Sequence, residues 1–309
     1  MSSIIIIDFG SQFIQLIARR VREVGVYSHI IPYDSFSQAD LEKYQPQGII
    51  LSGGPASVGS DFAPEMPAAI DKYTGPVLGI CYGMQLLSQR YGGTVEPSNK
   101  REYGRAAIRV RQSCALFDGV WEEGANPDVW MSRADKVSTI PDNFKVVADS
   151  AHSPFAVIAD EKRGLYGVQF HCEVTHTQDG AALLRNFVTN ICKITPNWSM
   201  ANYCANEIAR IREKLGSEEV ICGLSGGVDS AVTAALIHRA VGDQLTCIFV
   251  DHGLLRAGEA DQVVAVFQDH FQCRLIKIDA ADRFFAALDG VTDPEQKRKI
   301  IGAQFVQEF

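Results

Sequence analysis

Several features are missing from this sequence of 309 residues, and each absence excludes a class of protein. No apolar run approaches the roughly 20 residues that a membrane-spanning helix needs, so no membrane partner is expected. The N-terminus lacks the basic start, long apolar middle and cleavage site of a signal peptide, which favours a cytoplasmic location. A net charge of −8 leaves no broad basic surface, so nucleic acid is not an expected partner.

Paired cysteines are also missing. The eight cysteines are scattered, and none forms a CxxC pair, so the sequence does not indicate a structural zinc site. In a reducing compartment we expect free thiols, most of them small residues of the core. Charged residues make up 21% and apolar residues 46% of the chain, which is the balance of an ordinary globular protein.

The hydrophobic pattern predicts an α/β protein. Short apolar runs at Ile4–Ile7, Gly48–Ser52 and Pro76–Ile80 are typical of buried strands, and Gln12–Val24 has helical spacing. Continuous apolar strands between helices indicate a mostly parallel sheet that is buried on both faces. Between about residues 94 and 169 the pattern changes to that of antiparallel strands.

The length predicts two open, mostly parallel-sheet domains. We place the first over residues 1–194, a linker over 195–199, where TPNWS disfavours a helix, and the second over 200–309. The second domain offers about three strands, few for an open sheet, and its final helical pattern stops on Phe309. We therefore expect this domain to be incomplete at its C-terminus; the alternative is a frayed terminal helix.

A cysteine stands at a sharp strand-to-helix turn. In the segment PVLGICYGMQ, Cys81 follows an apolar strand and lies between Gly79 and Gly83. This is the pattern of a nucleophile elbow, with a thiol in place of the usual hydroxyl. The following helix N-terminus favours the thiolate, which is the reactive form. On this pattern alone, a buried structural cysteine is an equally good interpretation.

Two further segments supply partners for such a thiol. His171 and Glu173 lie two residues apart, so on an extended backbone both side chains face the same way. The histidine can then accept the thiol proton while the carboxylate orients its ring. The SGGP turn contains Gly53 and Gly54, whose unobstructed amides make an oxyanion hole plausible.

A second glycine turn predicts a phosphate site. In VICGLSGGVDSA, a strand leads into SGGVDS and then into a helix, so the amides of Gly226 and Gly227 can converge on an anion. Asp229 would repel phosphate unless a cation intervened, which indicates Mg²⁺. No lysine follows the glycines, so this is not a Walker A motif. The alternative is that Asp229 merely caps the helix.

The first set of motifs resembles the class I glutamine amidotransferases, which hydrolyse glutamine to glutamate and ammonia. The resemblance covers about residues 1–194, and DFGSQFIQLIARRVRE, ILSGGP, GICYGMQ and GVQFHCEVTHT are similar to the GMP synthetase family in particular. It implies that Cys81 is the nucleophile, His171 the base and Glu173 its orienter. The residues implied for the oxyanion hole and for glutamine binding are Gly53, Gly54, Tyr82 and Gln85.

The second glycine turn resembles the PP-loop of the ATP pyrophosphatases, which cleave ATP to AMP and pyrophosphate. The resemblance implies ATP and Mg²⁺ as cofactors, with Asp229 as the metal ligand. Adenine would lie near the end of the strand at Phe249–Asp251. The residues implied for ATP binding are Ser225, Gly226, Gly227, Val228, Asp229, Ser230, Ala231 and Val250.

Two such domains in one chain imply a glutamine-dependent, ATP-driven amination. The GMP synthetase resemblance implies xanthosine monophosphate as the acceptor, bound mainly by a C-terminal region beyond this chain, and a homodimer of the full-length protein. Two alternatives stay open. One is another PP-loop ligase, such as NAD synthetase, fused to an amidotransferase. The other is a catalytically impaired module that binds glutamine or ATP.

The chain departs from the family pattern in two places. Cys172 occupies the position between histidine and glutamate where the family usually has proline, which would leave His171 less rigid. We expect the Cys172 side chain to face the opposite way and not to compete as a nucleophile. Arg133 and Ala134 stand where the family usually has His-Gly, in a segment near the glutamine pocket. These two residues bear on the affinity for glutamine.

Overall fold

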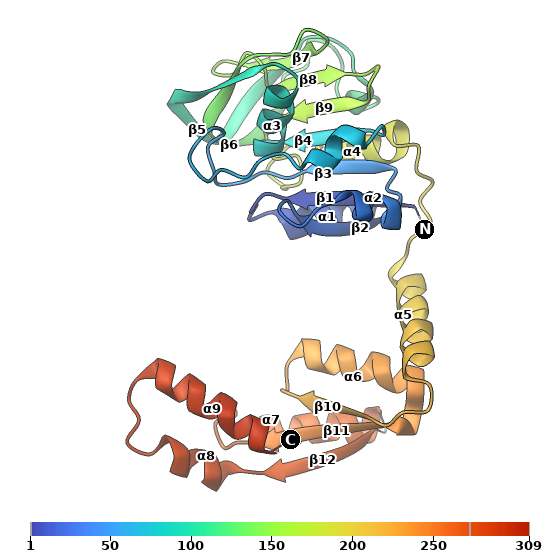
Figure 1. The fold of residues 1–309 in the computed structure, drawn as a ribbon, viewed down its shortest axis with the longest axis vertical. Coiled ribbons are helices and arrows are strands. Elements are labelled where there is room, and N and C mark those ends of the chain that lie inside the picture. Colours follow the sequence, from blue (N-terminus) through green and yellow to red (C-terminus); the bar gives the residue numbers. More distant parts are fainter. Residues whose placement is uncertain (1, 272, 309) are drawn as a thin grey trace. The chain divides into compact units, whose positions relative to one another are not determined.

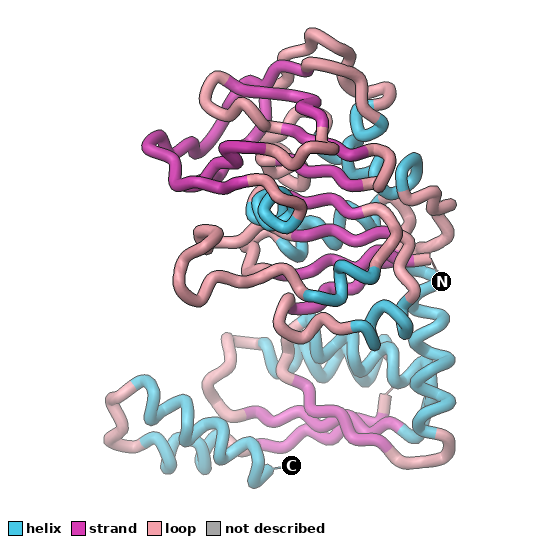
Figure 2. Tube along the Cα trace, turned by 45° about the horizontal axis from the view of Figure 1, so that its top comes forward, coloured by secondary structure: helices cyan, strands magenta, loops and turns pink. Residues whose placement is uncertain are grey.

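The computed structural model describes residues 2–271 and 273–308, apart from the side chains of residues 98–102, 133, 134, 269 and 270. The chain divides into two compact units, one ending at Ser199 and the other beginning at Met200 (Figure 1). Each unit contains its own sheet, as the alternating sequence pattern predicted (Figure 2).

Within the described residues, the first unit is built on a nine-stranded sheet in the order β2-β1-β3-β4-β9-β8-β7-β5-β6. The pairings among β2, β1, β3, β4 and β9 are parallel, and the pairings from β9 through β8, β7 and β5 to β6 are antiparallel. The strand bounds are β1 Ser3–Asp8, β2 Tyr27–Pro32, β3 Gly48–Leu51, β4 Val77–Ile80, β5 Thr94–Val110, β6 Asp128–Thr139, β7 Lys145–Ser150, β8 Val157–Asp160 and β9 Leu165–Val168.

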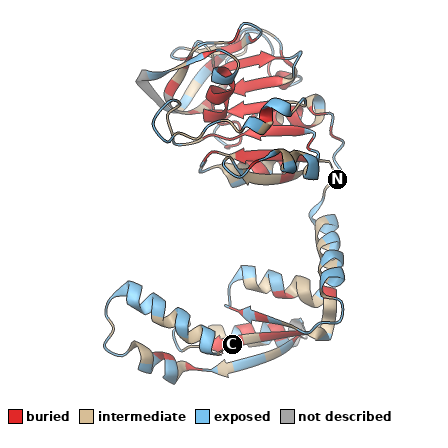
Figure 3. Ribbon diagram, in the orientation of Figure 1, coloured by how far each residue is buried: buried red, intermediate tan, exposed pale blue. Residues whose placement is uncertain are grey.

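The parallel part of this sheet is covered on both faces. In β1, Ile4 and Ile6 pack into one apolar cluster and Ile5 and Ile7 into another, because successive side chains point to opposite faces. All four isoleucines are fully buried, which explains the unbroken apolar run in the sequence. Figure 3 shows the buried residues concentrated along these central strands.

Helices supply the two covering layers. Ile17 from α1 and Leu183 from α4 join the first cluster, and Met84 and Leu87 from α3 join the second. The helix bounds in this unit are α1 Ile14–Glu23, α2 Gln38–Tyr44, α3 Tyr82–Arg90 and α4 Gly180–Asn186. The parallel strands and helices place the ends of β3, β4 and β9 side by side, and those ends carry the sequence motifs.

The antiparallel part differs most from the sequence prediction. The pattern indicated antiparallel strands between about residues 94 and 169 but not their bounds, whereas in the structure β5 begins at Thr94 and pairs along most of its length with β6. Both strands carry many polar residues and a register shift, so their sequence does not alternate cleanly. This pairing brings the β6 segment to the cysteine turn.

The second unit has a three-stranded parallel sheet in its described residues, in the order β10-β11-β12. Its core contains Leu224, Ala234, Cys247 and Phe249. The bounds are α5 Met200–Leu215, β10 Val220–Leu224, α6 Val228–Val241, β11 Leu245–Asp251, α7 Glu259–Ala265, β12 Arg274–Asp279, α8 Ala281–Leu288 and α9 Pro294–Glu308. No helix in the described residues is both long and apolar enough to cross a membrane. The α/β fold class is confirmed.

Candidate functional sites

Cys81 lies on a strained turn between β4 and α3. Its backbone has φ 52° and ψ −105°, outside the regions that L residues normally occupy. The turn depends on close backbone approach, since a Cβ added to Gly79 would lie 2.6 Å from the Gly83 carbonyl carbon. A Cβ on Gly83 would overlap the Leu51 carbonyl of β3. The glycines on either side of the cysteine are therefore a steric requirement of the elbow.

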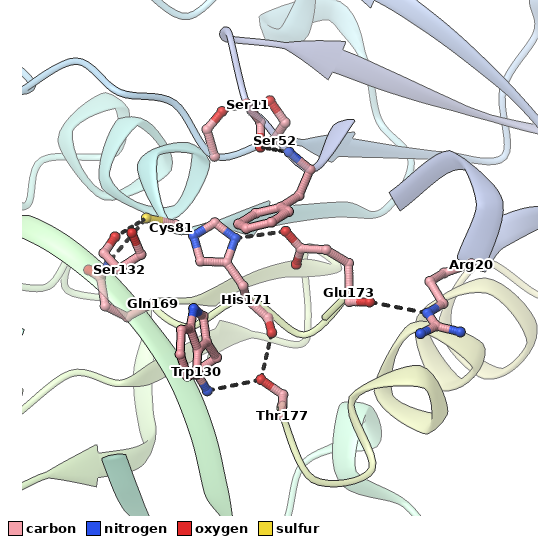
Figure 4. A network of polar contacts seen from close by, with 12 residues as sticks. Ser11, Arg20, Ser52, Cys81, Trp130, Ser132, Gln169, His171, Glu173 and Thr177 are labelled. Atoms are coloured by element: carbon pink, nitrogen blue, oxygen red, sulfur yellow. Dashed lines mark hydrogen bonds and ion pairs between the residues drawn. The ribbon is translucent and has the colours of Figure 1, made fainter. Parts of the chain in front are cut away.

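The imidazole of His171 lies between Cys81 and the carboxylate of Glu173 (Figure 4). His171 Nδ1 lies 2.7 Å from Glu173 Oε1, and both residues are buried. Burial opposes the charged ring, but hydrogen bonds with the side chains of Cys81 and Glu173 raise the pKa of His171 to about 10. The arrangement thus favours an imidazolium next to the sulfur.

Main-chain contacts hold this histidine in place. Its amide donates to the Trp130 carbonyl of β6 at 2.9 Å, and its carbonyl accepts from Thr177 Oγ1 at 2.6 Å. The Phe13 ring meets the imidazole edge-on at 5.2 Å between centroids. Arg20 of α1 donates to the Glu173 carbonyl at 3.1 Å. Contacts from α1 with its N-cap residue, from β6 and from Thr177 therefore position the base.

The extended backbone predicted for His171 and Glu173 is wrong. Strand β9 ends at Val168, and both residues lie in the loop that follows it. Their side chains still meet, because the loop is fixed by the contacts to β6 and α1 rather than by strand geometry. Cys172 faces the core with 2% exposure, and burial raises its pKa well above that of an ordinary thiol. Its thiol is therefore unreactive.

The SGGP turn lies directly against the cysteine and histidine. A Cβ on Gly53 would lie 3.0 Å from His171 Cε1 and 3.7 Å from Cys81 Cβ. Ser52 secures the turn by accepting from the Phe9 amide at 3.0 Å. Within the described chain, no hydrogen bond engages the amides of Gly54 or Tyr82. They are free to donate to a developing oxyanion.

A pocket of about 290 Å³ opens over Cys81. Gln85 of α3 is buried in its wall and donates to the Asp135 carbonyl at 3.2 Å and to Gln169 Oε1 at 3.4 Å. Gln169 Nε2 in turn lies 3.8 Å from Cys81 Sγ. The pocket lining comprises Gly10, Ser11, Gln12, Phe13, Gly54, Pro55, Ala56, Cys81, Tyr82, Gln85, Tyr103, Ser132, Asp135 and His171.

Sequence reasoning missed three polar residues of this site. Ser132, whose carbonyl lies 3.2 Å from Cys81 Sγ, and Asp135 reach the pocket from β6, and Gln169 follows β9. The sequence signal for Gln169 was its place two residues before His171. The side chains of Arg133 and Ala134, which depart from the family pattern, lie outside the described residues.

In the second unit, the SGGVDS turn joins β10 to α6. Ser225 and Ser230 tie the turn together with their hydroxyls 3.1 Å apart, and the Gly227 amide lies 3.3 Å from Ser225 Oγ. Gly226 has φ 75°, a left-handed conformation that suits glycine. Residues Ser225–Asp229 are exposed, and Ser230 and Ala231 are partly exposed at the start of the helix. The turn therefore presents amides and hydroxyls at a helix N-terminus.

Asp229 and Val250 occupy different environments. Asp229 is an exposed carboxylate in the first turn of α6, a hard oxygen ligand that fits Mg²⁺ shared with phosphate oxygens. No group of three metal-ligating side chains occurs among the described residues, so phosphate oxygens or water would complete the coordination of Mg²⁺ at Asp229. The Val250 side chain is buried against Ala280 and Phe284. Only its main chain is available to a nucleotide.

Comparison with known proteins agrees with this geometry. Residues 5–191 match the family of class I glutamine amidotransferases. The chain belongs to this family. Residues 200–302 match the NAD synthase family. The crystal structure of a candidate GMP synthase subunit from Thermoplasma acidophilum is 31% identical, with a TM-score of 0.57, and the match covers 62% of this chain and 94% of that one.

Curated relatives match both units of this amidotransferase family member. A glutamine-hydrolysing GMP synthase from Rhodopseudomonas palustris is 55% identical over 306 residues, which is 99% of this chain and 56% of the relative. Another from Rhizobium rhizogenes is 53% identical over 307 residues, 99% of this chain and 59% of the relative. The chain thus spans a little over half the length of these relatives.

Proposed function

We propose that the first unit hydrolyses glutamine to glutamate and ammonia. The observation that carries this proposal is the His171 ring between Cys81 and Glu173, beside a small pocket. The Cys81 thiolate attacks the side-chain amide carbon, and the amides of Gly54 and Tyr82 stabilise the resulting oxyanion. The His171 imidazolium then protonates the departing nitrogen, which leaves as ammonia.

A thioester between Cys81 and the glutamyl group remains after ammonia departs. Neutral His171 next removes a proton from water, which attacks the thioester carbonyl. Collapse of this second oxyanion breaks the carbon–sulfur bond and releases glutamate. The thiolate and the imidazolium are thereby restored for another turnover, and Glu173 keeps the ring oriented in both halves of the reaction.

For the second unit we propose ATP binding at residues 225–231, with Asp229 holding Mg²⁺. The loop amides and the N-terminus of α6 would bind the phosphates that leave as pyrophosphate. Mg²⁺ would neutralise phosphate charge beside Asp229. The relatives that match both units are GMP synthases, which favours xanthosine monophosphate as the acceptor. Its adenylate would react with ammonia to give GMP and AMP.

We propose that the complete synthase reaction requires more than these 309 residues. We expect this chain to hydrolyse glutamine weakly and to form no GMP, because the relatives extend well beyond the matched region. Production of GMP by this chain would contradict that expectation.

The homodimer and the cytoplasmic location stay predictions. The match to the NAD synthase family keeps another PP-loop ligase, such as an NAD synthetase, as the second candidate. It is tested by replacing xanthosine monophosphate in the assay with the acceptor that this other ligase aminates.

The deciding experiment is a glutaminase assay of the Cys81→Ala variant. Ammonia release should fall to background, because no other described thiol lines the pocket. Cys114→Ala is the matched control, since Cys114 is an equally buried cysteine outside the pocket and should retain the wild-type rate. Wild-type activity in Cys81→Ala would refute the proposal. An inactive wild-type chain, with or without ATP and xanthosine monophosphate, would support the impaired binding module.

A further inference from the structure

We propose that Ser52 is a positioning residue for the oxyanion hole, because its hydroxyl orients the peptide unit that carries the Gly54 amide. This inference rests on the proposed glutaminase function. Ser52 follows strand β3 directly, is fully buried and does not line the pocket over Cys81. It therefore acts on the reaction only through the groups that it holds in place.

The Ser52 hydroxyl makes two hydrogen bonds with opposite roles. It accepts from the Phe9 amide at 3.0 Å (Figure 4) and donates to the Gly53 carbonyl at 2.8 Å. A main-chain amide can only donate and a carbonyl can only accept, so the single hydroxyl proton points to Gly53. Because Phe9 directly follows β1, the hydroxyl links the end of that strand to the SGGP turn.

The bond to Gly53 fixes the direction of the next amide. The Gly53 carbonyl and the Gly54 N–H belong to one planar trans peptide unit, so they point in opposite directions. Since Ser52 holds the carbonyl on its own buried side, the N–H faces away from Ser52, and Gly54 lines the pocket. A peptide whose carbonyl accepts a hydrogen bond is also polarised, which strengthens its N–H as a donor.

Main-chain contacts hold the same turn against its neighbours. A Cβ added to Gly54 would lie 2.7 Å from the Phe9 carbonyl oxygen, so the Phe9 main chain packs directly against the turn. The Ser52 carbonyl accepts from the Gly83 amide at 3.0 Å, which ties the turn to the start of α3, where Tyr82 lies. Both proposed oxyanion donors are therefore positioned through Ser52.

The chemistry predicts which kinetic constant depends on this residue. An oxyanion forms only when the thiolate adds to the amide carbon, and again when water adds to the thioester. A misdirected Gly54 N–H should therefore slow these steps much more than it weakens the binding of glutamine. Loss of the Ser52 hydroxyl should lower kcat and leave KM nearly unchanged.

The first test is the steady-state glutaminase kinetics of Ser52→Ala. We expect kcat to fall about 10- to 100-fold with KM within about threefold, since complete loss of an oxyanion donor costs about 100- to 1,000-fold. Ser88→Ala is the matched control and should keep the wild-type kinetics. Ser88 is equally buried and donates to the Met84 carbonyl at 2.9 Å, but it lies outside the pocket. An unchanged kcat in Ser52→Ala, or the same loss in Ser88→Ala, would overturn the assignment.

The second test separates the oxyanion hole from the nucleophile and needs no turnover. Glutamate γ-semialdehyde carries an aldehyde where glutamine has its amide. The Cys81 thiolate adds to it reversibly, which forms a carbon–sulfur bond and places the negative charge on the aldehyde oxygen. Iodoacetamide instead alkylates the sulfur by displacing iodide, and this reaction forms no oxyanion. Affinity for the aldehyde is measured as protection of Cys81 from iodoacetamide, with the label located by mass spectrometry.

In Ser52→Ala the aldehyde should bind at least about tenfold more weakly than in wild type. Cyclisation of the aldehyde in solution is the same for both proteins and cancels in this ratio. Iodoacetamide alone should label Cys81 at the wild-type rate across the pH range, because Ser52 makes no hydrogen bond to Cys81, His171 or Glu173. Slower labelling by iodoacetamide would mean that the nucleophile itself is damaged and would overturn the assignment, as would unchanged affinity for the aldehyde.

The two proposals fail in different ways. Wild type that neither releases ammonia from glutamine nor binds the aldehyde at Cys81 would refute the glutaminase itself, and the role of Ser52 with it. Active wild type together with an equally active Ser52→Ala would refute only the role of Ser52.

Discussion

The hydrogen bond between Glu173 and His171 leads to a prediction that can be worked from the structure. Glu173 is fully buried, and its Oε1 lies 2.7 Å from His171 Nδ1. Replacing it with glutamine keeps the shape and removes the charge. In Glu173→Gln we expect the pKa of His171 to fall, because one of the two groups that stabilise the imidazolium has become neutral.

The size of the effect follows from the raised pKa. The difference between an ordinary histidine pKa of 6.5 and about 10 corresponds to a free energy on the order of 5 kcal/mol, since each pKa unit is about 1.4 kcal/mol. Burial lowers the pKa of His171, and the interactions with Cys81 and Glu173 together outweigh it by this free energy. A hydrogen bond to a charged group contributes about 1.5 to 3 kcal/mol. Glu173→Gln should therefore lower the pKa of His171 by roughly one to two units.

The assay is an NMR titration of the His171 ring, with the signal assigned by its loss in His171→Asn. The pH dependence of stability gives a second measurement. Because folding raises the pKa of His171, its stabilising contribution is complete below about pH 6.5 and is lost as the pH rises through about 10. The difference in unfolding free energy between wild type and Glu173→Gln should therefore shrink across that interval.

The control is Glu122→Gln, which removes an exposed carboxylate from the same unit and should leave the His171 titration unchanged. A His171 pKa in Glu173→Gln equal to that of wild type would refute the reasoning, since the carboxylate could not then be stabilising the imidazolium. Glutaminase kcat should fall at least tenfold in the same variant, because a misoriented ring no longer transfers the proton.

Two glycines give further predictions. Gly83→Ala should lower the free energy of unfolding by about 1 to 3 kcal/mol in chemical denaturation, because the new methyl overlaps the Leu51 carbonyl; unchanged stability would contradict the elbow geometry. Gly226→Ala should cost about 1 kcal/mol through its positive φ and should weaken ATP binding measured by calorimetry. Gly242 also has a positive φ but lies outside the SGGVDS turn, so Gly242→Ala is the control. If both variants lost the same amount of ATP affinity, that result would argue against phosphate binding by the SGGVDS turn.

Sequence reasoning succeeded where the physical cause is local. The turns at Cys81 and at SGGVDS could be located because a sharp turn needs glycine, and the structure shows the close contacts and the positive φ that require it. The buried strands were found because a parallel sheet covered on both faces needs continuous apolar residues. Each of these signals lies within a short stretch of consecutive residues.

Tertiary structure decided what surrounds the sulfur. His171 lies 90 positions from Cys81, and the loop that carries it is fixed by Trp130 and Arg20, which belong to other elements. Asp135 enters the pocket only because β6 pairs with β5, in a polar stretch without clean alternation. Strand pairing is a non-local interaction whose partners are chosen by packing, so a pattern within one segment cannot specify it. The turn that carries Cys81 was therefore readable from the chain, whereas the walls of the pocket beside it were set by folding.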